Sequence, residues 1–211
     1  MSAKKKENQL FFRYFEEWIE LYKVGAVRDV TLNKYYMTLQ KLELLAPNIR
    51  MYDLDRQSYQ QILNDYAFTH EKQTTMDFHH QLKGAILDAV DEGIIDKNPT
   101  RKVIIKGRKP RPKKTKFLNQ FELQGLLKNL DLNNEINWDW FILLVAKTGL
   151  RFSEALALTP NDFDFSKQSI SIEKTWDYKS SKGGMQETKN KSSNRKVIMD
   201  WQVAMKFSQM I

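Results

Sequence analysis

Hydrophobic residues recur with the period of an α-helix along the first stretch of the chain. Charged residues such as Arg13, Glu16 and Glu20 occupy the opposite face, so the pattern predicts an amphipathic helix over residues 10–22. Gly25 is expected to end it. The apolar face comprises Phe11, Tyr14, Phe15, Trp18, Ile19 and Tyr22.

Three more helices are predicted before residue 100. The second starts at Asp29 or Thr31, either of which can cap free amides, and stops before Pro47. The third covers residues 55–68, and the fourth covers 72–92 and is closed by Gly93. Four helices with short connections predict a compact helical bundle.

The remainder of the chain mixes helical and strand patterns. Helical spacing covers residues 118–130, 136–147 and 152–158. Strand-like alternation within 164–178, a polar stretch and a second strand at 195–199 predict a long hairpin with a basic tip, followed by a helix from residue 201. The expected fold class is therefore mainly α with a small β-hairpin or sheet.

Composition excludes several kinds of chemistry. The 211 residues include no cysteine and three histidines, which excludes disulfides, thiol nucleophiles and Cys-rich zinc sites. The longest apolar run (WFILLVA) is much shorter than the roughly 20 residues a membrane crossing needs, and the N-terminal MSAKKKENQ leads into no signal-peptide core. We expect a cytoplasmic protein with no membrane partner.

The net charge of +8 is concentrated in one short segment. Residues 1–106 and 118–211 carry about +1 each, whereas residues 107–117 (GRKPRPKKTKF) carry six cations and no acid. Two prolines favour an extended path, so we expect a basic linker joining domains 1–106 and 118–211. A solvated spacer is one interpretation; a strap along a phosphate backbone is the other. The interpretation as a strap along DNA assigns phosphate contacts to the linker cations Lys109, Arg111, Lys113, Lys114 and Lys116.

Several motifs occur in a family's order. The segment KTGLRFSEALAL (147–158), then DFDF (162–165), then a hairpin ending TKNKSSNRKVIMD, resembles the opening of the catalytic domain of the tyrosine recombinase, or phage integrase, family. LKGAILDAVDEGIIDKNP (82–99) resembles the end of that family's core-binding domain. The resemblance implies a SAM-like helical core-binding domain, a basic linker and the first part of an α+β catalytic domain.

The resemblance also implies a reaction. Such enzymes exchange DNA strands through a 3′-phosphotyrosine intermediate without metal or other cofactor, as tetramers on duplex DNA. Arg151 matches the first catalytic arginine, which would clamp phosphate, and Glu154 matches the acid that steadies it. Lys189 best matches the lysine that protonates the leaving oxygen, with Lys191 a competitor. Lys191 and Arg195 are otherwise expected to contact backbone phosphates, as Ser192 and Ser193 could.

Family analogy places the starts of the second and fourth bundle helices against DNA. The donors there are Thr31, Lys34, Tyr35, Thr74, Thr75 and Lys83. Helix N-termini suit phosphates, but the threonines could equally cap their own helices and Tyr35 could belong to the core. His79 and His80 lack the further ligands of a zinc site, so they indicate packing or phosphate contacts.

The elements that complete the family's catalytic site do not follow the hairpin. No histidine follows His80, so there is no downstream His-x-x-Arg, and the last tyrosine, Tyr178, precedes the hairpin tip. We therefore expect a fragment of a bacterial phage or mobile-element integrase that binds DNA without cutting it. A non-catalytic DNA-binding regulator or architectural protein is the alternative, and a helical protein-interaction domain is a weaker one.

Overall fold

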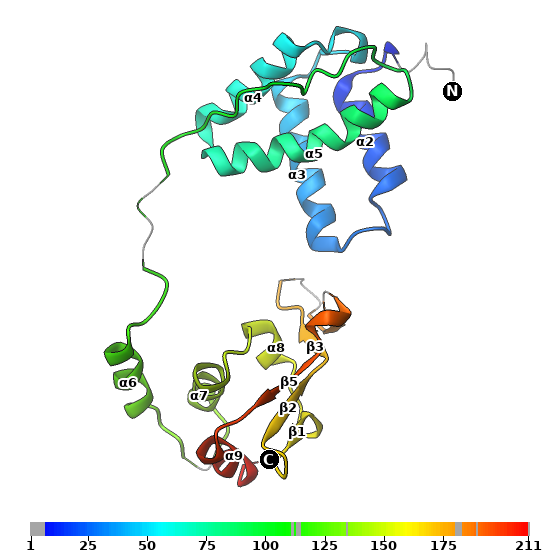
Figure 1. Ribbon diagram of the computed structural model, residues 1–211. Helices are drawn as coiled ribbons and strands as arrows, with labels where there is room; N and C mark the ends of the chain where they lie inside the picture. Colours follow the sequence, from blue (N-terminus) through cyan, green and yellow to red (C-terminus); the bar gives the residue numbers. More distant parts are fainter. Residues whose placement is uncertain are drawn as a thin grey trace. The chain divides into compact units, whose positions relative to one another are not determined.

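The computed structural model describes residues 7–110, 112, 115–133, 135–179, 183–188 and 190–210, without the side chain of Lys191. The chain forms two compact units, one ending at Lys114 and the other beginning at Thr115 (Figure 1). The division lies inside the predicted basic linker. Each unit has its own hydrophobic core, so the two are described separately.

The first unit is a helical bundle, as the sequence pattern predicts. Its helices are α2 (Phe11–Tyr22), α3 (Asp29–Leu45), α4 (Arg56–Thr69) and α5 (Lys72–Asp91), with a short 3-10 turn at Met51–Asp53. Five of the six residues on the predicted apolar face of α2 are buried against the other helices, whereas Tyr22, at the end of the helix, is 44% exposed. Fully buried side chains at the centre of the bundle are Phe11, Phe15, Ile19, Leu42, Leu82 and Ile86.

Helix α3 begins at Asp29, one of the two starts that the sequence predicts, but it lacks the predicted side-chain cap. Arg28 is the residue that precedes the helix, and no side chain caps it, so the prediction of an Asp29 or Thr31 cap is wrong. Asp29 instead lies in the first turn, where its negative charge favours the positive end of the helix dipole. Helix α4 does have a side-chain cap, because Asp55 accepts from the amide of Ser58 at 2.7 Å.

After α5 the chain returns along α4 as an extended strap, residues 103–108 (Figure 1). The Gln60 amide accepts from the Ile104 N–H at 2.8 Å and donates to the Ile104 carbonyl at 2.9 Å. Further on, the Arg108 N–H donates to the His70 carbonyl at 2.8 Å. The charge pattern predicted that Gly107 and Arg108 belong to the linker. In the structure these two residues lie against the bundle.

The second unit combines helices with two small sheets. Its helices are α6 (Gln120–Lys128), α7 (Trp138–Thr148), α8 (Phe152–Leu156) and α9 (Trp201–Ser208). Short 3-10 turns lie at Pro160–Asp162 and Lys191–Ser193. Trp140, Leu144, Ile170, Ile172 and Phe207 form the centre of its core. The predicted mainly α fold with a small β component is confirmed.

The strand region is not the single long hairpin that the sequence predicts. Strands β1 (Phe163–Asp164), β2 (Ser169–Ile172) and β5 (Arg195–Ile198) form one antiparallel sheet in the order β1-β2-β5. Strands β3 (Lys174–Trp176) and β4 (Met185–Glu187) form a separate pair. The two pairs are separate because one residue, Glu173, lies between β2 and β3, whereas residues 188–194, with the 3-10 turn, lie between β4 and β5, so the ladder cannot continue in register.

Candidate functional site

Arg151 and Glu154 lie together where α7 gives way to α8. Gly149 ends α7 in the left-handed conformation, and Arg151 is the residue that precedes α8. The Glu154 carboxylate accepts from the Arg151 backbone N–H at 2.9 Å and from its Nη1 at 2.8 Å. The Arg151 side chain is 71% exposed whereas that of Glu154 is 2% exposed, so a buried carboxylate orients an outward-facing guanidinium.

Arg195 on β5 joins the same carboxylate. Its Nη1 and Nη2 donate to Glu154 Oε1 and Oε2 at 2.9 and 2.8 Å, a two-bond pairing. The hydrogen bonds from Arg195, with smaller contributions from Arg151, outweigh the opposing effect of burial and lower the pKa of Glu154 to about 2. One ionised carboxylate therefore holds two guanidinium groups.

The sequence predicts that Arg195 contacts phosphate, and it does not predict the bond from Arg195 to Glu154 that the structure shows. The two residues are 41 positions apart, so no local spacing connects them. A signal was nevertheless present, because strand alternation places Arg195 on the same side of β5 as Val197 and Met199, which pack into the core. A cation on an inward face requires an acidic partner.

The cluster of Arg151, Glu154 and Arg195 is chemically suited to an anion. Two cations and one carboxylate leave a net charge of +1. Arg151 uses Nη1 for Glu154, and its Nη2 and Nε make no hydrogen bond to any residue that the structure describes. A planar guanidinium with free donors is the side chain best matched to two phosphate oxygens.

The segment after β3 packs against the start of α8, next to this cluster. The rings of Phe152 and Tyr178 meet edge to face at 5.2 Å, which joins the start of α8 to the segment after β3. The Thr188 hydroxyl donates to Asn194 Oδ1 at 2.6 Å and closes the turn between them. Lys189 lies outside the described residues, and the Lys191 side chain is not described either. The assignment of a general-acid lysine to one of these positions stays a prediction.

A second polar cluster in this unit was not foreseen. Lys174 Nζ contacts Asp162 Oδ2 at 2.8 Å and Thr159 Oγ1 at 3.0 Å. Burial opposes ionisation of Asp162, but hydrogen bonds from Lys174 and Thr159 together outweigh it and lower the pKa of that carboxyl. The sequence feature that could have indicated this cluster is a lysine, Lys174, in a strand that follows the acidic DFDF segment. The cluster ties β3 to the turn after α8 and is structural.

The residues of the bundle that are expected to contact DNA differ in how far they are exposed to solvent. Thr31, Lys34 and Thr74 are exposed, and Lys83 is half-buried. Tyr35 packs against Phe15 and Trp18 and is only partly exposed, which is the core role that the sequence left open.

For Thr75 the prediction of a DNA contact is wrong. The residue is 0% exposed, and its hydroxyl donates to the Glu71 carbonyl at 3.3 Å. A β-branched hydroxyl on an inward helix face satisfies its hydrogen bond within its own helix.

His79 is a packing residue. It is buried, its Nδ1 lies 2.9 Å from the Tyr59 hydroxyl, and burial, with the nearby charges of His80 and Lys83, lowers its pKa to about 4. His80 is exposed. Within the described part of the chain, no group of three or more His, Asp or Glu side chains is arranged to hold a metal ion.

Only part of the basic linker can be placed. Lys109 and Lys116 are exposed, whereas Arg111, Lys113 and Lys114 lie outside the described residues. None of the helices that the structure describes has the length and apolar character to cross a membrane.

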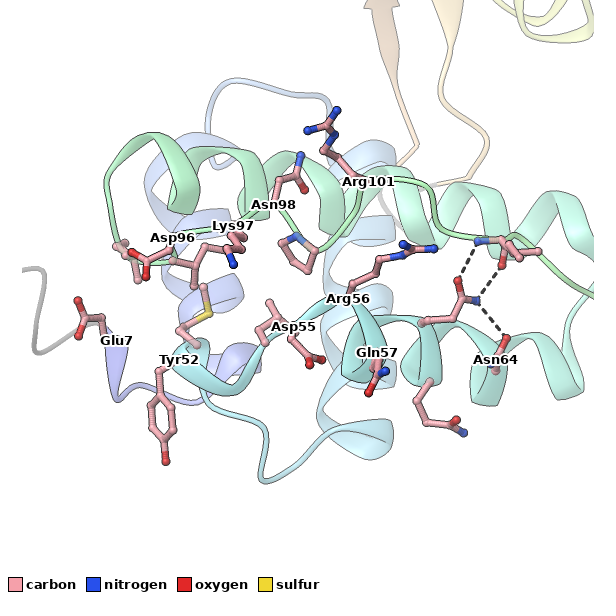
Figure 2. Close-up of a pocket in the computed structure, with 18 of the residues that line it drawn as sticks. Glu7, Tyr52, Asp55, Arg56, Gln57, Asn64, Asp96, Lys97, Asn98 and Arg101 are labelled. Atoms are coloured by element: carbon pink, nitrogen blue, oxygen red, sulfur yellow. Dashed lines mark hydrogen bonds between the residues drawn. The ribbon is translucent and has the colours of Figure 1, made fainter.

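A pocket in the first unit lies between α4 and residues 94–106, a segment that includes part of the strap (Figure 2). Its lining carries charges of both signs, including the acids Asp55 and Asp96 and the cations Arg56 and Arg101. Gln60 is one of the lining residues, and its two hydrogen bonds to Ile104 are among the dashed lines in Figure 2. None of the residues predicted for DNA contact or catalysis lines it, and its mixed charge does not select an anion.

The two units together define a class of fold: a helical core-binding domain joined to an α+β domain of the integrase type. Comparison with solved structures identifies the same class. A fragment of the transposon Tn1549 integrase, in complex with circular-intermediate DNA, superposes with a TM-score of 0.76 at 18% identity over 95% of the chain. A lambda integrase tetramer bound to a Holliday junction superposes with a TM-score of 0.62 at 15% identity over 85% of the chain.

The structural neighbours are thus tyrosine recombinases of the transposon and phage integrase type, as the sequence motifs indicate. The chain spans 64% of the length of the Tn1549 integrase fragment and 51% of the lambda integrase chain. The N-terminal domain of an integrase from Lactococcus lactis, prophage pi2 protein 01, is 35% identical over 47% of this chain and 94% of its own, with a TM-score of 0.46. No family model and no curated protein matches the sequence.

Proposed function

We propose that this chain binds duplex DNA as part of a site-specific recombinase, with Arg151 contacting the phosphate at which strands are exchanged. The observation that carries the proposal is the Arg151–Glu154 pair. A carboxylate that is 2% exposed holds an arginine that is 71% exposed, at the TGLR-x-x-EAL motif. Burying a carboxylate is costly, and here its hydrogen bonds orient a cation toward solvent. This arrangement is suited to binding an anion outside the protein.

The proposed chemistry is strand exchange through a 3′-phosphotyrosine. Arg151 would compensate the charge that grows on the phosphate, and a hairpin lysine would protonate the leaving 5′-oxygen. The chain has no tyrosine after Tyr178 and no histidine after His80, so it lacks the residues that would complete such a site. We propose that these 211 residues bind DNA in the cytoplasm of a bacterial host, and that recombination takes place in tetramers assembled on DNA.

Similarity to integrases solved with DNA supports the binding part of the proposal, as does the basic linker. Exposed Thr31, Lys34 and Thr74 in the first unit and exposed Lys109 and Lys116 in the linker provide donors for backbone phosphates. These contacts would position the chain on DNA without reading base sequence.

The test is duplex binding by fluorescence anisotropy over a series of salt concentrations, with Arg151→Gln as the probe. The matched control is Arg13→Gln, because Arg13 also forms an exposed i,i+3 pair with a glutamate, Glu16. We expect Arg151→Gln to weaken binding and to reduce the slope of log K against log salt by about 1, and the control to change neither. Loss of affinity in both variants alike, or in neither, would contradict the proposed role of Arg151.

A further inference from the structure

We infer that Arg195 is a positioning residue of the proposed phosphate site: it holds Glu154 in place, so that Glu154 directs Arg151 outward, and does not itself bind phosphate. The inference rests on the proposed function. It starts from the two-bond pairing of Arg195 with Glu154, a contact that links β5 to α8 across 41 positions of sequence.

Burial makes the second arginine necessary. A carboxylate removed from water is destabilised unless charged partners satisfy both of its oxygens. Arg151 alone supplies one side-chain bond and one backbone bond, and its side chain is largely solvated. Arg195, whose side chain is 35% exposed, supplies the two remaining bonds and a charge that is less screened by water. Without it, Glu154 would rotate or take up a proton.

Arg195 is poorly placed to serve a phosphate as well. Both of its terminal nitrogens are used by Glu154, and Nη1 also lies 3.4 Å from the Ser193 carbonyl. A phosphate that engaged this guanidinium would have to displace an ionised carboxylate or approach close to it. Arg151, by contrast, keeps Nη2 and Nε available toward solvent. Arg195 therefore holds the Glu154 carboxylate, and Arg151 faces the proposed ligand.

The position of Arg195 also anchors the turn that carries the hairpin lysines. Arg195 pairs with Ile172 in the β2–β5 ladder, so its backbone is set by the sheet. The turn immediately before it is closed by the Thr188–Asn194 hydrogen bond. The Glu154 carboxylate thus holds both Arg151 and the C-terminal end of the segment that contains positions 189 and 191.

A double-mutant cycle on the 211-residue chain separates positioning from direct binding. Duplex affinity is measured for Arg151→Gln, Arg195→Gln and the double variant, with Lys196→Gln as the control, since Lys196 is the exposed neighbouring cation on the same strand. We expect Arg195→Gln to weaken binding roughly tenfold, as Arg151→Gln does, but to change affinity less than about twofold when Arg151 is already replaced. The double variant should lose about one unit of salt slope in total.

Additive losses, with a salt-slope reduction of about two units in the double variant, would make Arg195 an independent phosphate ligand and overturn the inference. Because Arg195→Gln could destabilise the second unit, Arg195→Lys is the second variant. A lysine keeps the charge and can replace one of the two bonds, so it should recover part of the affinity while remaining dependent on Arg151. Equal loss in Arg195→Lys and Arg195→Gln, with the unit folded in both, would also contradict positioning.

A measurement without DNA keeps this inference distinct from the proposed function. The pKa of the Glu154 carboxyl, followed by carbon-13 NMR, should rise by roughly 1 to 3 units in Arg195→Gln and stay unchanged in Lys196→Gln. The Arg151 Nε–H signal should show increased motion in the same variant. If the chain failed to bind duplex DNA, the proposed function would be wrong, and these signals would still decide whether Arg195 positions Arg151. Unchanged titration and unchanged motion would overturn the inference.

Discussion

Gly107 should tolerate no side chain, although its backbone conformation is not one that requires glycine. A Cβ built at this position would lie 2.1 Å from the Lys72 amide nitrogen, 2.4 Å from the Lys72 Cα and 2.6 Å from the Glu71 carbonyl carbon. Those atoms belong to the start of α5 and cannot move as a flexible side chain could. In Gly107→Ala the strap must therefore separate from the bundle at this point.

The cost follows from the contacts that hold the strap. Separation breaks the Arg108–His70 backbone hydrogen bond and weakens the Gln60–Ile104 pair, each worth about 1 kcal/mol net. Arg108 also loses its position over the Phe68 ring, an exposed contact worth about 0.5–1 kcal/mol. Alanine also lowers the conformational entropy of the unfolded chain, which offsets about 0.4–1 kcal/mol of this loss of stability. We expect the first unit to lose about 1–3 kcal/mol, and its Tm to fall by about 4–8 °C for each kcal/mol.

The assay is thermal unfolding combined with limited trypsin digestion and mass mapping. Lys102, Lys106 and Arg108 lie on or beside the strap, so release should make cleavage there faster in Gly107→Ala than in the parent chain. Gly125→Ala is the matched control, since a Cβ there meets no atom within 4 Å and alanine favours the helix that contains it. A Gly107→Ala chain with the parent Tm and the parent cleavage pattern would refute the steric argument.

Three further predictions concern charge and chemistry. Because the folded-state pKa of Glu154 is about 2 and its usual value is 4.5, its ion pairs contribute stability above about pH 4.5 that is lost as pH falls toward 2. Urea unfolding of the second unit should show Glu154→Gln to be less stable at pH 7 by on the order of 3 kcal/mol, with the difference shrinking below pH 4.5; a pH-independent difference would contradict this. Replacing Lys109, Arg111, Lys113 and Lys114 by alanine should flatten the log K against log salt slope by up to roughly 3 to 4 units, and an unchanged slope would reduce the linker to a solvated spacer. The chain should form no covalent adduct with a nicked duplex designed to trap one, so a denaturation-resistant band on a gel would identify an unexpected nucleophile.

The local chemistry of the chain determined much of the architecture. The helical spacing of apolar residues predicted the four bundle helices α2 to α5. Each helix buries one face, and the apolar residues of that face recur every three or four positions along the sequence. Gly149 predicted the end of α7 for a similarly local reason, since glycine is favoured in the left-handed conformation that it adopts there. The motif around Arg151 and Glu154 likewise implied their pairing, which needs only one helical turn.

Contacts between distant segments were decided by tertiary structure alone. The Arg195–Glu154 pair depends on β5 returning beside β2 and facing α8, which no local pattern contains. The burial of Thr75 and the close approach of Gly107 to Lys72 are equally non-local, because each depends on which surface packs against that backbone. Helix and strand periodicity arise from interactions a few residues apart, whereas the partners of a buried charge are chosen by the whole fold. The sequence motif was therefore sufficient to identify Arg151, which faces the proposed ligand. Only the tertiary structure identified Arg195, which is proposed to hold Arg151 in place through Glu154.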